Sequence, residues 1–105
     1  MSVFLRKIRV AVTPKTWLLK TTLSNGAVVF GKNRAGFGGR GIFIFRDALE
    51  PELEHLDQLL PAEGVLIDVG ANTGVYSLKA AKHFSQKGVV VAIEPFPDVL
   101  GHSVA

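Results

Sequence analysis

The alternation of hydrophobic and polar positions changes its period along the chain, which predicts both strands and helices. Residues 17–23 and 27–31 are β-prone runs separated by Ser24-Asn25-Gly26, and Asn-Gly tolerates the positive φ angles of a tight hairpin turn. Residues 33–41 contain four glycines and are expected to form a connecting loop, followed by a short strand at 42–45. The first part of the chain is therefore expected to be β-rich. A strand after the loop also disfavours a phosphate cradle, which needs a helix there.

The next segment has a helical pattern. Asp47 and Glu50 have the spacing of a capping box, and Pro51 is acceptable in a first helical turn. Leucines recur on one face of the expected helix, at positions 49, 53, 56 and 60. We predict a helix over 47–60.

A strand–helix–strand unit follows. Residues 65–69 and 89–93 are short apolar runs typical of strands that are buried on both faces. Residues 75–85 between them have the apolar and polar faces of an amphipathic helix. The order predicts a βαβ unit with parallel strands, which assigns the chain to the α/β class.

Composition limits the kind of protein. The chain has 105 residues, of which 48% are hydrophobic and 20% charged, as in a globular domain. The absence of cysteine excludes disulfides and thiolate zinc sites and fits a reducing compartment, so a cytoplasmic location is expected. The basic start lacks the apolar run of a secretory signal, and no uncharged stretch approaches the about 20 residues of a membrane span.

Charge is divided unequally. Residues 1–46 hold nine of the twelve Lys and Arg residues and no acid, whereas residues 47–105 hold all nine acids. Such a basic segment can bind a polyanion. Alternatively, the two segments can complement each other, or the basic residues can simply alternate outward from short strands. These two alternatives are favoured, and nucleic acid is not an expected partner, because the basic residues are spread singly and no nucleic-acid motif accompanies them.

Two segments at the carboxyl ends of the predicted parallel strands indicate a ligand site. Gly70 and Gly74 allow a sharp turn and a close backbone approach to a ligand. Glu94, at the tip of the second strand, is suited to accept hydrogen bonds from the hydroxyls of a ribose, so we expect a ligand that contains adenosine. A nicotinamide enzyme is disfavoured because Asn72 and Val75 occupy the later glycine positions of its fingerprint, and no Lys-Ser/Thr pair makes a P-loop.

The segments Asp68-Val-Gly-Ala-Asn-Thr-Gly-Val-Tyr-Ser77 and Ala92-Ile-Glu-Pro-Phe-Pro97 resemble the FkbM family of class I S-adenosylmethionine-dependent methyltransferases. The match covers about residues 47–100, with Asn72 where most methyltransferases have a glycine. The resemblance implies a Rossmann-like fold and O-methyl transfer to a hydroxyl of a sugar, glycolipid or secondary metabolite. It also implies a cofactor site in which Glu94 holds the ribose of S-adenosylmethionine and the methionine part is surrounded by Asp68, Gly70, Ala71, Asn72, Thr73 and Gly74.

The resemblance also predicts the organisation of the chain. Residues 1–46 would be a basic, β-rich extension, and residues 47–105 the N-terminal portion of a Rossmann-like methyltransferase domain. Only the first βαβ unit of that fold is expected within 47–105, so the acceptor pocket and catalytic base are not assigned and turnover by this chain alone is not expected. Self-association through the unpaired strand edge is expected. The three histidines lack the spacing of metal ligands, and no metal site is predicted.

Two other functions stay open at this point. One is an adenosyl-binding remnant without catalytic activity. The other is a module that binds polyanions through its basic first 46 residues, for which affinity should fall steeply with salt.

Overall fold

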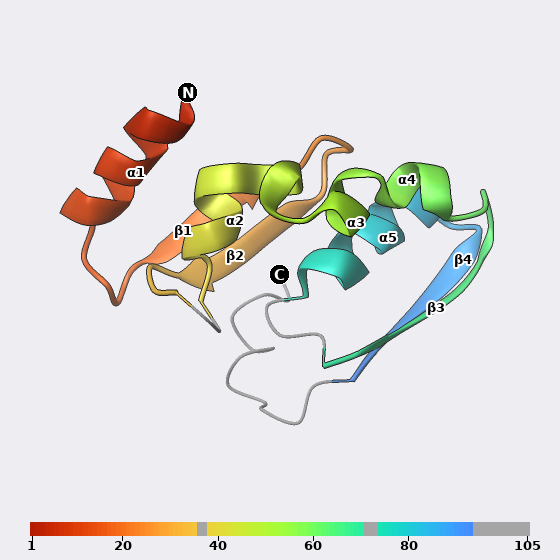
Figure 1. Cartoon of the computed structure of the whole chain (residues 1–105). Coiled ribbons are helices and arrows are strands. Elements are labelled where there is room, and N and C mark those ends of the chain that lie inside the picture. The colour runs from red at the N-terminus through yellow and green to blue at the C-terminus, as the bar shows by residue number, and fades with distance from the viewer. Residues whose placement is uncertain (36–37, 71–73, 94–105) are drawn as a thin grey trace.

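The computed structural model describes residues 1–35, 38–70 and 74–93 (Figure 1). Its elements form two small two-stranded sheets and several helices. In chain order they are α1 (Val3–Val12), β1 (Leu18–Thr22), β2 (Val28–Lys32), α2 (Arg40–Phe45), the 3₁₀ helix η1 (Arg46–Leu49), α3 (Pro51–Glu54), α4 (Leu56–Leu59), β3 (Gly64–Val69), α5 (Val75–Phe84) and β4 (Gly88–Ile93).

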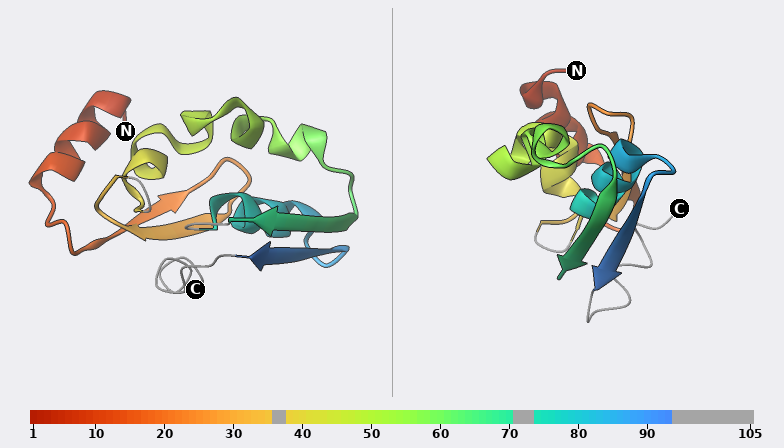
Figure 2. Two further views of the ribbon diagram at one scale, coloured as in Figure 1. Left: turned by 60° about the horizontal axis from the view of Figure 1, so that its bottom comes forward. Right: turned by 90° about the vertical axis from the view of Figure 1, so that its right-hand side faces the viewer.

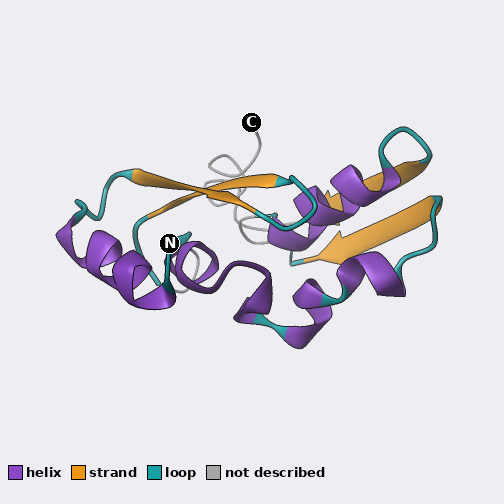
Figure 3. Ribbon diagram, turned by 90° about the horizontal axis from the view of Figure 1, so that it is seen from above, coloured by secondary structure: helices purple, strands orange, loops and turns teal. Residues whose placement is uncertain are grey.

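The predicted hairpin is confirmed. β1 and β2 pair antiparallel from Leu18 opposite Lys32 to Thr22 opposite Val28. In the turn, Gly26 adopts a φ of +90°, which an L side chain rarely permits. The hairpin lies between α1 and the β3–α5–β4 unit, which occupy opposite ends of an elongated molecule (Figure 3).

The expected strand at 42–45 is wrong, because these residues belong to α2, and the first 46 residues are not β-rich since α1 also lies among them. A helical turn lets the two buried isoleucines of α2 pack in different directions. Ile42 joins the apolar cluster beneath the hairpin, and Ile44 packs with Val10 of α1 and Leu19 of β1. Tertiary packing thus overrides the β propensity of Ile-Phe-Ile.

The single helix predicted over 47–60 is also wrong. The segment is divided into η1, α3 and α4. Glu50 is extended, with φ −141° and ψ 143°, because a residue that precedes proline disfavours helical angles. Asp47 therefore caps no helix, although Leu53 and Leu56 of the predicted leucine stripe are buried.

The βαβ unit is confirmed, with β3 and β4 parallel from Gly64 opposite Gly88 to Val69 opposite Ile93. Helix α5 lies on one face of this sheet (Figure 2). The prediction that both strands are buried on both faces is wrong: the other face carries apolar side chains with exposed fractions of 43–76%, at Val65, Ile67, Val69, Val89, Val91 and Ile93. Within the described residues, no helix covers that face (Figure 2).

The hairpin and α5 share one apolar cluster. Leu23, Ala27 and Val29 of the hairpin pack with Leu53 of α3, and Val75, Tyr76 and Leu78 of α5 contact this cluster. Among the described residues, no helix is long and apolar enough to cross a membrane.

A buried ion pair joins the same elements. The side chain of Lys79 is fully buried, and its Nζ lies 2.5 Å from Oδ2 of Asp47 and 2.5 Å from the carbonyl oxygen of Leu53. Burial raises the pKa of Asp47, but hydrogen bonds from Lys79 and Ser24 lower it more, so the net pKa lies below the ordinary 3.8. The pair therefore fixes α5 against η1 and α3.

Candidate functional site

The candidate site lies at the carboxyl ends of the parallel strands, where the sequence predicted it. The amide of Gly70 donates to the carbonyl of Ile93 at 2.6 Å, which holds the end of β3 against the end of β4. Gly74 then caps the N-terminus of α5. Asp68, Gly70 and Gly74 are therefore at one edge of the sheet, whereas Ala71, Asn72, Thr73 and Glu94 lie outside the described residues.

The two described glycines of the loop have the conformation that the sequence analysis expected. Gly70 has a φ of +71° and Gly74 a φ of +80°, both in the left-handed region. A Cβ atom added at Gly70 would have no described atom within 4 Å. Backbone conformation, rather than close packing, thus requires glycine at position 70, and the space beside it is open to a ligand.

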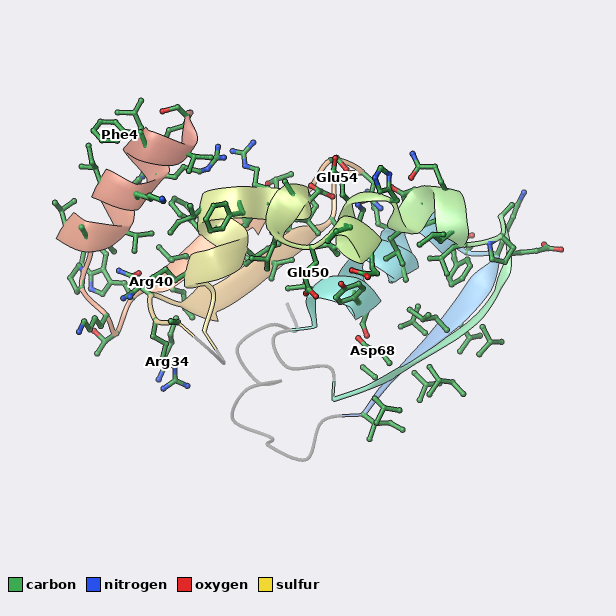
Figure 4. The ribbon with its side chains drawn as sticks, in the orientation of Figure 1. Phe4, Arg34, Arg40, Glu50, Glu54 and Asp68 are labelled. Atoms are coloured by element: carbon green, nitrogen blue, oxygen red, sulfur yellow. The ribbon has the colours of Figure 1, made fainter. Side chains whose placement is uncertain are left out.

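A cavity of about 520 Å³ opens at this edge and lies within the usual size range of small-molecule sites, about 300–1,000 Å³. Asp68, Gly70 and Tyr76 line it from the βαβ unit, while Glu50 and Arg40 line it from the preceding segments. Figure 4 shows the labelled Glu50 and Asp68 near the start of α5. Aliphatic and aromatic side chains form most of the remaining wall: Ile42, Ile44, Phe45, Leu49, Leu53 and Val75.

Asp68 is held in place by the helix that follows the glycine loop. The hydroxyl of Ser77, which is buried, donates to Oδ2 of Asp68 at 2.7 Å. Ser77 lies on the same turn of α5 as Tyr76. The end of β3 and the first turn of α5 thus fix one carboxylate at the mouth of the cavity.

Tyr76 is the most perturbed titratable group of the site. Burial and the neighbouring carboxylates raise its pKa to about 12, with Glu50 contributing both charge and a hydrogen bond, and Glu52 and Asp68 contributing charge. A phenol with this pKa stays protonated at neutral pH. Tyr76 is therefore a hydrogen-bond donor in the site and not a base.

Sequence reasoning missed three of the lining residues. Glu50 was interpreted as part of a capping box, Arg40 as a loop residue, and Tyr76 was quoted only as part of the family-like segment. Tyr76 could have been proposed as a site residue from its position, because it lies two residues after Gly74, the second glycine of the loop. Nothing in the local sequence marks Glu50 or Arg40, because the fold brings them to the site from more than one element.

His55 and His83, the histidines that the structure describes, give no alternative centre. His83 links α5 to α4, with Nδ1 3.1 Å from Oδ1 of Asp57 and Nε2 2.8 Å from the carbonyl oxygen of Pro61. Across residues 1–35, 38–70 and 74–93, no group of three His, Asp or Glu side chains is placed to hold a metal ion.

No protein-family model, curated protein or solved structure matches this chain. The resemblance to FkbM methyltransferases therefore stays a prediction from the two sequence segments, and the function must be argued from the geometry of the site.

Proposed function

We propose that this chain binds S-adenosylmethionine in the cavity at the carboxyl ends of β3 and β4. One observation carries the proposal: near the end of a strand in a parallel βαβ unit, the fixed carboxylate of Asp68 and the left-handed Gly70 both line a cavity of about 520 Å³. In open parallel sheets, ligands bind beyond the carboxyl ends of the strands. The activity proposed for the site is methyl transfer to a hydroxyl of a sugar, glycolipid or secondary metabolite.

The charges that line the cavity fit this cofactor. S-adenosylmethionine carries a positive sulfonium and a positive ammonium, and the cavity offers the carboxylates of Asp68 and Glu50 and the ring of Tyr76. Carboxylates stabilise nearby cations, and an aromatic face does so through its quadrupole. Arg40 is available for the carboxylate of the methionine part. Bound there, the cofactor would supply an electrophilic methyl group.

The same charges argue against a dinucleotide. Asp68 and Glu50 both act on Tyr76 and line one cavity, so a pyrophosphate there would face two carboxylates. Like charges within a few ångströms repel, and burial strengthens the repulsion. A cationic adenosyl ligand is therefore favoured over NAD or a nucleoside triphosphate.

The remaining residues would position the ligand and exclude water. The apolar wall removes solvent from the sulfonium, which strengthens its interaction with the carboxylates. The hydroxyl of Ser77 would keep Asp68 oriented toward the ligand through its hydrogen bond to Oδ2. Glu94, the next residue after β4, is assigned to the ribose on the strength of the sequence alone.

Calorimetric titration of the chain with S-adenosylmethionine and with S-adenosylhomocysteine tests the proposal. The second ligand lacks the sulfonium charge, so Glu50→Gln is expected to weaken S-adenosylmethionine by about tenfold and S-adenosylhomocysteine much less. Asp68→Asn is expected to weaken both, because the ammonium is common to both ligands. Transfer of a labelled methyl group to sugar or glycolipid hydroxyls is measured separately, and none is expected from this chain alone, so the test of the proposal is cofactor binding.

Two glycine variants control for strain. Gly70→Asn keeps a residue that tolerates positive φ and adds only bulk, whereas Gly26→Ala strains a left-handed glycine that does not line the cavity. Binding lost in Gly70→Asn and kept in Gly26→Ala would support the site. A folded chain that binds neither ligand would contradict the proposal.

A further inference from the structure

A second cavity, of about 350 Å³, lies beside α2, which also lines the first cavity, but the two share no lining residue. It is bounded by α1, by β1 and by the residues at the end of α2. Four of its lining side chains are cationic, Arg6, Arg9, Lys20 and Arg46, and none is acidic. The cavity therefore concentrates positive charge from three separate elements.

These cations have no acidic partners among the described residues. Both ion pairs within residues 1–35, 38–70 and 74–93 involve side chains of residues 47–105 alone, Lys79 with Asp47 and His83 with Asp57. Of the two favoured explanations for the division of charge, mutual complementation of the basic and acidic segments therefore finds no support in ion pairs of the described residues. Among the described residues, no acidic side chain forms an ion pair with the basic side chains of residues 1–46.

Arg6 is the cation of this cavity that is most in need of a negative partner, because only 9% of its surface is exposed to solvent. Its Nε donates to the carbonyl of Ile44 at 2.6 Å, and its Nη1 donates to the carbonyl of Met1. Both acceptors are neutral. A buried guanidinium that faces only carbonyls keeps an uncompensated charge, and an anion in the cavity would compensate it.

Two other residues that line this cavity are unusual, Thr21 in its hydrogen bonding and Arg46 in its backbone conformation. Thr21 is 3% exposed, and its hydroxyl oxygen has no hydrogen-bond partner among the described residues. Buried hydroxyls nearly always have a partner, so this exception requires an explanation, and a polar group in the adjacent cavity would provide one. Arg46 has φ 53° and ψ −138°, a backbone conformation that side chains rarely adopt, so its position beside the cavity is maintained at the expense of strain.

We propose that this cavity binds a phosphate group, as a separate site from that of the proposed cofactor. Guanidinium groups match phosphate geometry because their N–H donors form a planar fork, and Lys20 adds a point charge. The group can belong to a soluble phosphate or to a phospholipid headgroup. The second source is included because α1, beside the cavity, exposes apolar residues between basic ones: Phe4 is 70% exposed and points outward in Figure 4, and Val12 is 76% exposed.

The test measures binding of inorganic phosphate by calorimetry and binding of phosphatidylcholine vesicles with and without phosphatidic acid by sedimentation. Lys20→Gln and Arg46→Gly are each expected to weaken binding by about tenfold. Arg46→Gly also releases the backbone strain, so its fold should be at least as stable as the original. Lys15→Gln is the matched control, because it removes the same charge outside the cavity.

The outcomes separate the sources. Phosphate binding that is lost in Arg46→Gly and kept in Lys15→Gln would support a soluble ligand. Vesicle binding that needs phosphatidic acid, is lost in Arg46→Gly and falls in Phe4→Ser, without binding of free phosphate, would support a headgroup. An equal loss in Lys15→Gln would indicate diffuse charge attraction and overturn the proposal, as would the absence of both kinds of binding.

Discussion

Removing the carboxylate of Asp47 is expected to destabilise this fold strongly, because the ammonium that it neutralises is completely buried. In an Asp47→Asn variant, Nζ of Lys79 would face only neutral oxygens, among them the carbonyl of Leu53. The side chain has no route to solvent, since Lys79 is 0% exposed within the apolar packing of α5 and α3. The structure thus predicts a much larger effect than a surface ion pair would give.

The magnitude follows from the geometry. At the 2.5 Å that separates Nζ of Lys79 from Oδ2 of Asp47, the attraction is about 7 kcal/mol for an effective dielectric constant of about 20. Desolvation of the ions offsets much of this, and loss of one partner of a buried pair costs about 3–5 kcal/mol. We expect a loss of that size in the free energy of unfolding, out of the about 5–15 kcal/mol typical of folded domains.

Urea unfolding followed by circular dichroism measures this free energy. The diagnostic comparison is a double variant, Asp47→Asn with Lys79→Met, which removes both charges and retains apolar volume. It should be more stable than Asp47→Asn alone, because the uncompensated ammonium is gone. Asp57→Asn is the control: its partner His83 is partly exposed, so the expected cost is below about 1 kcal/mol.

The pH dependence gives an independent check. Because the pKa of Asp47 is lower in the folded state than its ordinary 3.8, the carboxylate contributes its full stabilisation above that value. The contribution disappears as the pH falls through the folded pKa. Asp47→Asn should therefore lose less stability than the original chain between neutral pH and strong acid. A cost below about 1 kcal/mol at neutral pH, or additivity of the two substitutions, would refute the reasoning.

Three further predictions concern other parts of the structure. Tyr76 is the chain's only tyrosine, so ultraviolet absorbance should show its phenol titrating near pH 12, and at a lower pH in Glu50→Gln, which removes one of the causes of the shift but not the burial; no difference between the two would contradict the contact with Glu50. Gly88→Ala should lower the urea midpoint, because a Cβ would lie 2.5 Å from Phe84 and 2.7 Å from the carbonyl oxygen of Gly64; an unchanged midpoint would argue against that packing. Asn33→Asp should cost about 2–4 kcal/mol in urea unfolding, because a carboxylate cannot donate to the Val10 and Thr13 carbonyls as Asn33 does; a cost within error would show that those bonds are dispensable.

The parts of the fold that sequence reasoning predicted correctly are those in which local and tertiary preferences agree. Asn25-Gly26 favours a hairpin turn by backbone conformation alone, and the two apolar runs with an amphipathic helix between them suffice to predict the order of the β3–α5–β4 unit. The failures are places where another element decides. Ile42 and Ile44 are β-formers that reach separate apolar clusters only through a helical turn.

The candidate site divides in the same way. The position of Asp68, Gly70 and Gly74 at one edge of the sheet could be predicted, because a strand end and a glycine-rich turn leave local signals in the sequence. Glu50 could not, because its place beside Tyr76 depends on the break before Pro51, which turns a presumed capping residue toward the cavity. The ion pair between Asp47 and Lys79 could not be predicted either, because the sequence pattern places Lys79 on the polar face of its helix, where a lysine is expected to be exposed to solvent.

The two cavities give the unequal division of charge a physical meaning. Asp68 and Glu50 make the cavity of the βαβ unit suitable for a cation, and Arg6 with its basic neighbours makes the other suitable for an anion. Opposite charges that were placed only to bind each other would form ion pairs, yet within the described residues no basic side chain of the first 46 lies within ion-pair distance of an acid. Because the basic and acidic side chains lie apart, the fold forgoes the attraction that ion pairs between them would provide. Separate ligands for the two cavities, a sulfonium cofactor and a phosphate, would account for that separation.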